Sequence, residues 1–262
     1  MKSIRFERDE SVGRIILANP PANMIDMHYA PSLSQAVHEA SVSDIRVLVI
    51  KAVGPHFSFG GDVRDWPGHD RNWFRTMVAE VNQCYRAIEA LRVPTVAAVR
   101  GVCWGGGFEL ALSCDFIVAA ENSTFRCVEV TTGMLPIAGA LQRLAELTGR
   151  RRASRYSMLG EPIPGDLAGQ LGIASYVVPE SEVEGTAEAL ARQLALGPTR
   201  SYAATRTVLK AWSAGGVPAA DAMLLDLTMD LFDTEDVTNG FINTAEALKR
   251  EVEPPGMIFN GR

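Results

Sequence analysis

The chain has 262 residues, a formal net charge of −6 and four cysteines, and 47% of its residues are hydrophobic. This length suits one large domain, or one domain with a small appendage, and the composition is that of an ordinary globular protein. The negative charge and the lack of a basic tract argue against nucleic-acid binding, because phosphate neutralisation needs clustered lysines and arginines.

Metal, disulfide and membrane signals are also missing from the sequence. The cysteines form no CxxC pair and the four histidines are scattered, so we predict neither a zinc site nor a disulfide framework. The arginine cluster at 150–155 is interpreted as a solvated helix end. Charges interrupt the N-terminal segment, and no apolar run is long enough to span a membrane. We therefore expect a cytoplasmic protein with reduced thiols and no membrane or nucleic-acid partner.

The N-terminal third predicts a hairpin followed by helix and strand. Apolar segments 4–8 and 13–18 flank a polar turn, which is typical of a hairpin. An amphipathic stretch near 31–40 follows the prolines at 20 and 21. Residues 45–53 then form a β-branched run that predicts a strand buried on both faces. Apolar spacing over about 72–91 predicts a helix.

The middle of the chain predicts a mostly parallel sheet. A second buried strand is expected at 94–99, a short helix ending near Ser113 comes next, and a third strand is expected at 116–120. Strand, helix and strand in this order indicate βαβ units. We therefore expect an α/β fold.

Helices predominate after Leu141, interrupted by a short apolar segment at 173–178. The tail at 198–250 predicts consecutive helices, with breaks at Gly215-Gly216 and near 233–235. Such a tail has too little core of its own. We therefore divide the chain into a core domain, 1–197, and a helical region, 198–262, that packs on the core or on a neighbouring subunit.

A glycine triplet, Gly105-Gly106-Gly107, lies between the strand at 94–99 and the following short helix. Backbone N–H groups at such a helix start lack intrahelical partners and suit an anion or a developing oxyanion. The alternative is a dinucleotide-binding fingerprint, with Glu129 as its acid. It is disfavoured because Leu110 stands where a small residue is required. Considered alone, Glu109 is equally compatible with a first-turn glutamate that interacts favourably with the helix dipole and has no catalytic role.

A second glycine-containing loop, 54–62, follows the strand at 45–53 and includes Phe57-Ser-Phe-Gly-Gly-Asp62. By itself this pattern is typical of a turn. Two glycines nevertheless allow the backbone to approach a ligand closely.

Together, these motifs resemble the crotonase, or enoyl-CoA hydratase and isomerase, superfamily over nearly the whole chain. The resemblance rests on several motifs in the family's order: Asn19-Pro-Pro-Ala-Asn23, the loop at 57–62, Trp104 to Asp115, Phe125 to Glu129 with Gly133 and Pro136, Leu141-Gln-Arg-Leu, Gly149, Gly165 to Pro179 and Phe259-Asn-Gly261. It implies a crotonase (ClpP-like) fold of repeated ββα units with a C-terminal helical region. The chain departs from the family pattern at Phe59, Val128 and Ala140.

The resemblance also assigns the site. It places the oxyanion-hole amides at Phe59 and Gly106, and the two catalytic carboxylates at Glu109 and Glu129. The residues it assigns to substrate binding are Ala22, Phe57, Gly60, Gly61, Asp62, Trp66, Trp104, Gly105, Met134, Leu135, Phe241 and Lys249.

The implied activity is a lyase that hydrates a 2-enoyl-CoA to a 3-hydroxyacyl-CoA, with an enolate stabilised in an oxyanion hole. Two carboxylates suit this reaction, because one group must activate water and another must deliver a proton. An isomerase, or another enolate-forming reaction on the same fold, is the first alternative. A noncatalytic acyl-CoA-binding protein is the second. The resemblance implies acyl-CoA as substrate, no cofactor or metal, and self-association as a homotrimer or homohexamer.

Overall fold

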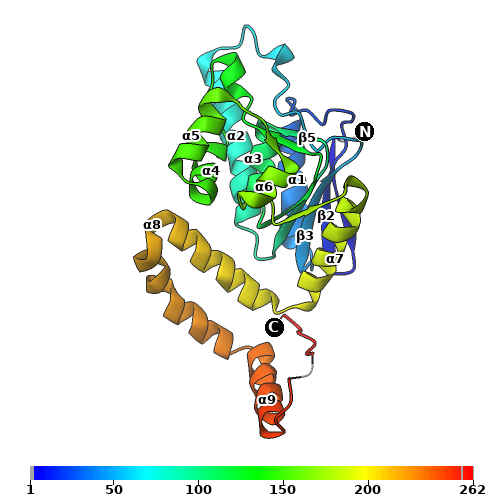
Figure 1. Cartoon of the computed structure of the whole chain (residues 1–262), viewed down its shortest axis with the longest axis vertical. Helices are drawn as coiled ribbons and strands as arrows, with labels where there is room; N and C mark the ends of the chain where they lie inside the picture. The colour runs from blue at the N-terminus through cyan, green and yellow to red at the C-terminus, as the bar shows by residue number, and fades with distance from the viewer. Residues whose placement is uncertain (1–2, 255, 262) are drawn as a thin grey trace.

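A mostly parallel sheet forms the centre of the fold (Figure 1). The computed structural model describes residues 3–254 and 256–261. Within them, the order of the six strands in this sheet is β1-β2-β3-β4-β6-β9. The first two strands form the antiparallel hairpin that the sequence predicts, and each later neighbour is parallel. The strands are β1 (Ile4–Asp9), β2 (Val12–Leu17), β3 (Val47–Ala52), β4 (Thr95–Val99), β6 (Phe116–Ala120) and β9 (Tyr176–Val178).

A smaller sheet lies beside the glycine triplet and has the order β5-β7-β8 in the described chain. Its strands are β5 (Val102–Trp104), β7 (Thr124–Arg126) and β8 (Ile163–Pro164). The loop after β3 joins this sheet through a parallel bridge between Ser58 and Cys103. The sequence did not predict these strands, because two or three residues are too few to show a periodic pattern.

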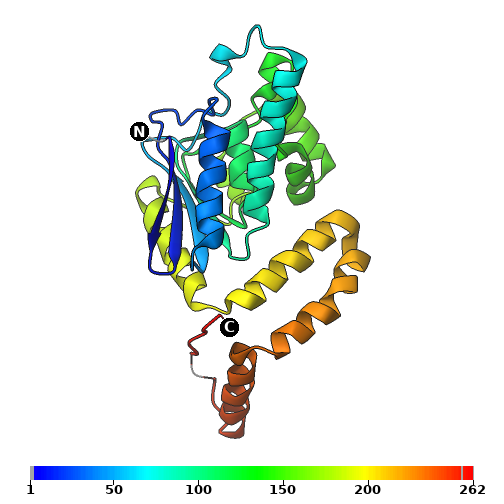
Figure 2. The same ribbon diagram turned by 180° about the vertical axis from the view of Figure 1, so that it is seen from behind.

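Helices cover both faces of the large sheet (Figure 2). Helices α1 (Tyr29–Val42), α2 (Arg71–Glu89) and α3 (Gly106–Leu112) share one core with it, and α7 (Val183–Leu196) packs on the other face. The near-continuous apolar runs of β3 and β4 follow from burial on both faces. The other elements are η1 (Val63–Asp65), η2 (Glu129–Thr132), α4 (Ala140–Thr148), α5 (Arg150–Leu159), α6 (Gly165–Gln170) and η3 (Glu180–Glu182).

The C-terminal helices form an arm that extends away from the sheet (Figure 1). Helix α8 (Thr199–Phe232) is interrupted at Gly215 and Gly216, where the backbone leaves the helical region, and the chain reverses direction there. Helix α9 (Glu235–Lys249) follows after a short break. Both predicted breaks are therefore confirmed. Apolar side chains on the arm remain exposed in the single chain, among them Leu209, Trp212, Leu225, Phe241 and Leu248.

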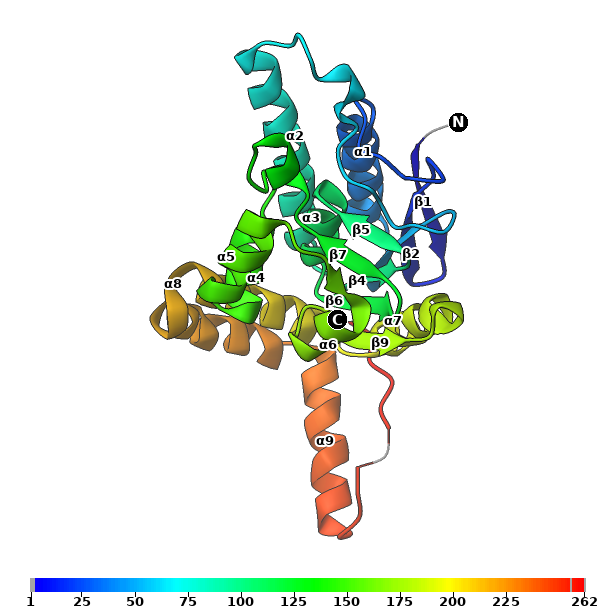
Figure 3. The same cartoon turned by 45° about the horizontal axis from the view of Figure 1, so that its top comes forward.

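The end of the chain returns from the arm to the body (Figure 3). Arg46 directly precedes β3. Its guanidinium donates to Thr199 Oγ1 at 2.8 Å, to the Phe259 carbonyl at 2.8 Å and to the Gly197 carbonyl at 2.6 Å. Asp236 accepts hydrogen bonds from the backbone amides of 260 and 261. Arg46 thus joins the body to both ends of the arm.

The predicted domain boundary falls two residues before the start of α8 at Thr199. The division into 1–197 and 198–262 stays a prediction, and residues 1, 2, 255 and 262 of those ranges lie outside the described part. None of the helices formed by the described residues has the length and apolarity needed to cross a membrane.

Replacing Arg46 with alanine is expected to lower the free energy of unfolding by about 2 kcal/mol, because hydrogen bonds from a charged donor are lost. It should also speed proteolysis of the arm. Urea unfolding and limited proteolysis measure the two effects. Arg5→Ala is the matched control, since the Arg5 guanidinium makes an exposed ion pair with Glu7. Equal unfolding free energies for the two variants would contradict the role assigned to Arg46.

Candidate active site

The two glycine-containing segments predicted from the sequence lie against each other. A Cβ atom added at Gly60 would lie 2.8 Å from the Trp104 carbonyl oxygen and 3.4 Å from the Gly106 nitrogen. Gly60 also has φ of +88°, a backbone conformation that other residues rarely adopt. Glycine at position 60 therefore lets the two backbones approach within van der Waals contact.

Helix α3 begins at Gly106, and the Gly106 amide has no acceptor among the described residues. The other face of this residue is held by two buried tyrosines. Tyr85 donates its hydroxyl to the Gly106 carbonyl at 2.8 Å, and the Tyr29 hydroxyl lies 3.3 Å from that of Tyr85. Burial raises the pKa of Tyr85 well above its usual range, so this phenol stays a neutral donor. Neither tyrosine could be singled out from the sequence, because both occupy positions typical of an ordinary core.

The amide assigned to Phe59 is already occupied. The Phe59 N–H donates to the Ala22 carbonyl at 2.9 Å, so in this structure it is not free to donate to a substrate oxygen. The Gly60 amide donates to Ser58 Oγ, and the Asp62 amide donates to the Ile25 carbonyl. The Gly61 amide has no acceptor within the described chain. Gly61 and Gly106 therefore carry the free N–H groups of the two segments.

Glu109 is buried in the first turns of α3, with 1% of its surface exposed. Its Oε1 accepts hydrogen bonds from the backbone amides of Ala138, at 2.6 Å, and Ala140, at 3.2 Å. Its Oε2 has no partner in the described structure. Burial raises the Glu109 pKa, while these amides and the nearby Arg143 guanidinium act in the opposite direction.

The turn that holds Glu109 is itself fixed by charged and polar side chains. Arg143 forms an ion pair with Glu89 and donates to the Gly139 carbonyl at 3.0 Å. Asn82 on α2 donates to the Ile137 carbonyl at 2.8 Å. The role of the Ala138 and Ala140 amides could not be predicted from the sequence, because nearly every residue type supplies a backbone N–H.

Glu129 opens the 3-10 helix η2 and lies beside the glycine triplet. A Cβ atom added at Gly105 would lie 3.3 Å from Glu129 Oε1. Burial raises the pKa of Glu129 to about 7, its own backbone amide lowers it, and the charge of Glu109 raises it further. The Glu129 Oε2 is buried without a partner in the described structure. The structure thus brings both predicted carboxyl groups together, each with one unpaired oxygen.

Two tryptophans border this arrangement. A Cβ atom added at Gly61 would lie 3.0 Å from Trp66 Cζ2, so the indole ring lies directly on this glycine. Trp66 also contacts Phe74 edge to face, with ring centroids 5.8 Å apart. The Trp104 ring contacts Phe59 and donates its indole N–H to Thr124 Oγ1 at 3.1 Å.

Several predicted binding residues lie elsewhere. Phe57 stays a predicted substrate-binding residue, but its ring is fully buried in the hydrophobic core, which leaves only its backbone for such a contact. The Asp62 carboxylate caps η1 and pairs with Arg64. Met134 and Leu135 are exposed on the turn after η2.

Phe241 and Lys249 are on α9, which stands away from the body of its own chain (Figure 3). Phe241 stacks on Phe232 of α8 instead. The single chain therefore does not bring either residue to Glu109 and Glu129.

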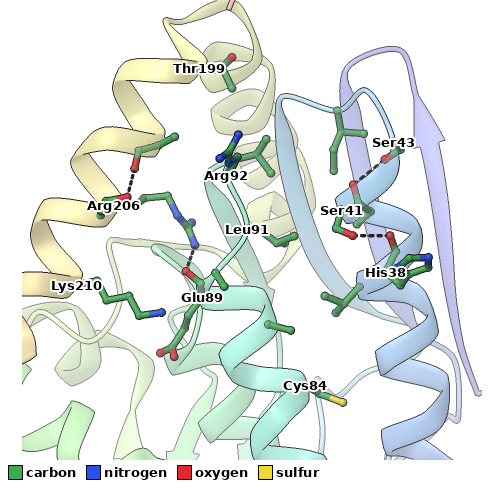
Figure 4. Close-up of a pocket in the computed structure, with 18 of the residues that line it drawn as sticks. His38, Ser41, Ser43, Cys84, Glu89, Leu91, Arg92, Thr199, Arg206 and Lys210 are labelled. Atoms are coloured by element: carbon green, nitrogen blue, oxygen red, sulfur yellow. Dashed lines mark hydrogen bonds between the residues drawn. The ribbon is translucent and has the colours of Figure 1, made fainter. Parts of the chain in front are cut away.

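A cavity of about 1480 Å³ opens between α1, α2 and the arm (Figure 4). Arg206, Lys210 and Cys84 are among the side chains that line it. None of the predicted site residues lines this cavity, so its size alone does not make it the candidate active site. Among the described residues, no group of three or more histidine, cysteine, aspartate or glutamate side chains is arranged to hold a metal ion.

Comparison with known proteins identifies the family. Residues 7–253 match the family model described as enoyl-CoA hydratase/isomerase. A Bacillus subtilis protein named "Probable enoyl-CoA hydratase" is 30% identical over 246 residues, covering 92% of this chain and 94% of the relative. The 2,3-dehydroadipyl-CoA hydratase of Escherichia coli is 30% identical over 249 residues, covering 92% and 94%.

A solved structure shows the same architecture. An enoyl-CoA hydratase subunit from Geobacillus kaustophilus superposes with a TM-score of 0.88 at 28% identity, covering 99% of this chain and 98% of the other. The mostly parallel sheet, the helical arm and the two glycine-containing loops thus fit one known fold. The chain is a crotonase-fold enzyme that belongs to the enoyl-CoA hydratase/isomerase family.

Proposed function

We propose that this enzyme hydrates a 2-enoyl-CoA thioester to a 3-hydroxyacyl-CoA. The observation that carries the proposal is the pair of carboxyl groups, those of the buried Glu109 and the half-buried Glu129, beside two unpaired backbone amides. The family match and the names of the relatives agree with it. An isomerase that relies on one acid has no use for the second carboxyl group, so hydration accounts for more of the site.

The thioester carbonyl oxygen accepts hydrogen bonds from the Gly61 and Gly106 amides in this proposal. Negative charge develops on that oxygen when water adds to the conjugated double bond. A fixed donor of this kind is worth roughly 2.7 to 4 kcal/mol in a comparable acyl-transfer site. Tyr85 supports the arrangement from behind, because its bond to the Gly106 carbonyl fixes the start of α3.

The two carboxyl groups divide the proton transfers between them. Glu109 acts as the base that deprotonates water at Cβ, because two backbone amides hold its Oε1 and, with Arg143, offset part of the burial that raises its pKa. Glu129 delivers the proton to Cα, because a pKa of about 7 leaves a protonated fraction near neutral pH. The free Oε2 atoms of both residues are the groups available to the water and the substrate. The proposal uses only side chains and amides of this enzyme and no cofactor.

We also propose that the enzyme works as a trimer or hexamer. The apolar side chains of α8 and α9 are exposed in the single chain, which favours burial against another copy. In such an assembly Phe241 and Lys249 would lie near the coenzyme site of a neighbour.

Glu109→Gln and Glu129→Gln are each expected to lower kcat by at least about 100-fold, because each removes a positioned acid or base. Binding of a saturated acyl-CoA should change little. The assay follows loss of the conjugated enoyl thioester absorbance with crotonyl-CoA, and calorimetry follows binding. Glu121→Gln is the control, since it removes an exposed carboxylate. A wild-type rate in either active-site variant would remove that residue from the mechanism.

The raised pKa of Glu129 predicts a pH-dependent stability difference. Between its ordinary value of 4.5 and about 7, the folded protein binds more protons at this site than the unfolded chain does. The stability that Glu129 contributes is therefore present below pH 4.5 and is lost as pH rises through 7. Glu129→Gln does not titrate, so its unfolding free energy relative to wild type should increase between pH 5.5 and 7.5. Urea unfolding at both pH values measures this difference.

Glu182→Gln is the matched control for that experiment, because Glu182 is exposed on η3. Its unfolding free energy relative to wild type should stay nearly constant over the same range. A Glu129→Gln difference that stays constant or shrinks with rising pH would contradict the assigned pKa.

Light scattering at micromolar concentration should give the mass of a trimer or a hexamer. Leu225→Glu, which places a charge on the exposed apolar surface of α8, should shift the population toward smaller species. A monomeric wild-type protein would contradict the proposed assembly, while leaving the hydration assay as a separate test.

A further inference from the structure

A groove of about 560 Å³ runs along helix α2, separate from the larger cavity beside the arm. Its apolar wall includes Phe74, Val78 and Ile137. All of its charged lining residues are arginines, namely Arg71, Arg75 and Arg86. The groove thus combines an apolar surface with positive charge in a protein whose net charge is −6.

The groove begins next to the candidate active site. Tyr85 on α2 bonds to the Gly106 carbonyl, and Asn82, one helical turn earlier, bonds to the Ile137 carbonyl. Residues three or four apart share one face of a helix, so this face continues from Tyr85 through Asn82 to Val78 and the groove. Ile137 is also adjacent in sequence to Ala138, whose amide holds Glu109. Ile137 in the groove wall is therefore one residue in sequence from the amide that holds the Glu109 carboxylate.

The direction of the substrate places the groove at the acyl end. The thioester lies at Gly61 and Gly106, and the reacting carbons lie between Glu109 and Glu129. The segment 19–23 resembles the family's segment beside the coenzyme, and the carbonyl of its Ala22 accepts the Phe59 amide on the loop that carries Gly61. An acyl chain that extended past Glu109 toward Ile137 would meet the groove.

The arginines carry charge that no acid neutralises. Arg71, Arg75 and Arg86 make no ion pair with any described residue, and no aspartate or glutamate lines the groove. Arg71 is the first residue of α2, and Arg75 follows one turn later. Positive side chains at a helix N-terminus oppose the helix dipole, and like charges four residues apart repel. The Asp70 carboxylate already caps this N-terminus, so the repulsion between the two arginines is the effect that a bound anion would relieve.

We propose that this groove binds the far end of the acyl chain and that Arg71 and Arg75 bind a carboxylate there. The substrate class is then the CoA thioester of a 2-enoic acid with a second carboxylate at its distal end. Methylene groups contact the apolar wall, and a guanidinium binds a carboxylate through two parallel hydrogen bonds. Arg75 is ten residues from Tyr85, about 15 Å along the helix axis, so an acyl chain must be long and extended to reach Arg75. This inference rests on the proposed function and specifies its substrate.

The test compares pairs of 2-enoyl-CoA thioesters of equal chain length, one ending in a methyl group and one in a carboxylate, over increasing chain lengths. Wild-type enzyme should have the higher kcat/KM for the carboxylate at one or more lengths. In Arg71→Gln/Arg75→Gln the ratio of the two kcat/KM values should fall at least about tenfold, since charge-assisted hydrogen bonds are lost. Both substrates carry the same coenzyme, so arginines that bind its phosphates would affect both alike.

Arg192→Gln on α7 is the control, because it removes an exposed positive charge on the far side of the sheet. It should leave the ratio unchanged. Equal kcat/KM values in wild type, or an equal loss for both substrates in the double variant, would overturn the inference while hydration stands. If wild type hydrates neither substrate, the proposed function fails. Calorimetry with the saturated thioesters then tests the groove alone, and equal affinities for the two would overturn it.

Discussion

The candidate active site depends on keeping two carboxyl groups out of water beside each other. Burial favours the neutral form of each, and the charge of Glu109 further raises the pKa of Glu129. An isolated ionised carboxylate would be far too costly to bury, so its hydrogen bonds decide whether it can ionise. Glu109 has two backbone amides and Glu129 has much weaker support. This difference gives two chemically similar side chains different roles.

The surrounding fold supplies the rigidity that this arrangement needs. A Cβ atom at Gly107 would lie 2.5 Å from Ser58 Cβ, so α3 and the loop after β3 touch through a glycine. Ser58 in turn donates its hydroxyl to the Asn23 carbonyl at 2.7 Å. Asn23 bonds through its side chain to the Val53 and His56 carbonyls. Hydrogen bonds between backbone and small polar groups thus position the free amides, and the Trp66 indole lies on Gly61.

Much of the fold could be predicted from the sequence because long apolar patterns decide it. The hairpin, the buried strands β3 and β4, helix α2 and the break at Gly215-Gly216 all follow from periodicity or from glycine. The strands β5, β7 and β8 could not, since their pairing depends on contacts with distant segments.

The site divides in the same way. Glu109, Glu129 and the glycines of both loops could be predicted because their residue types carry the resemblance. The choice between the Phe59 and Gly61 amides could not, because it depends on which N–H the Ala22 carbonyl occupies. The role of Tyr85 also needed the structure, since a tyrosine on a core-facing position gives no sign of where its hydroxyl points.

Amides of Gly61 and Gly106 that bind the thioester oxygen would polarise its carbonyl. Isotope-edited infrared spectroscopy of an acyl-CoA labelled with ¹³C at the thioester carbonyl measures this polarisation directly. We expect a carbonyl stretching frequency that is clearly lower in the enzyme complex than in free solution. A carbonyl frequency unchanged on binding would contradict this role of the two amides.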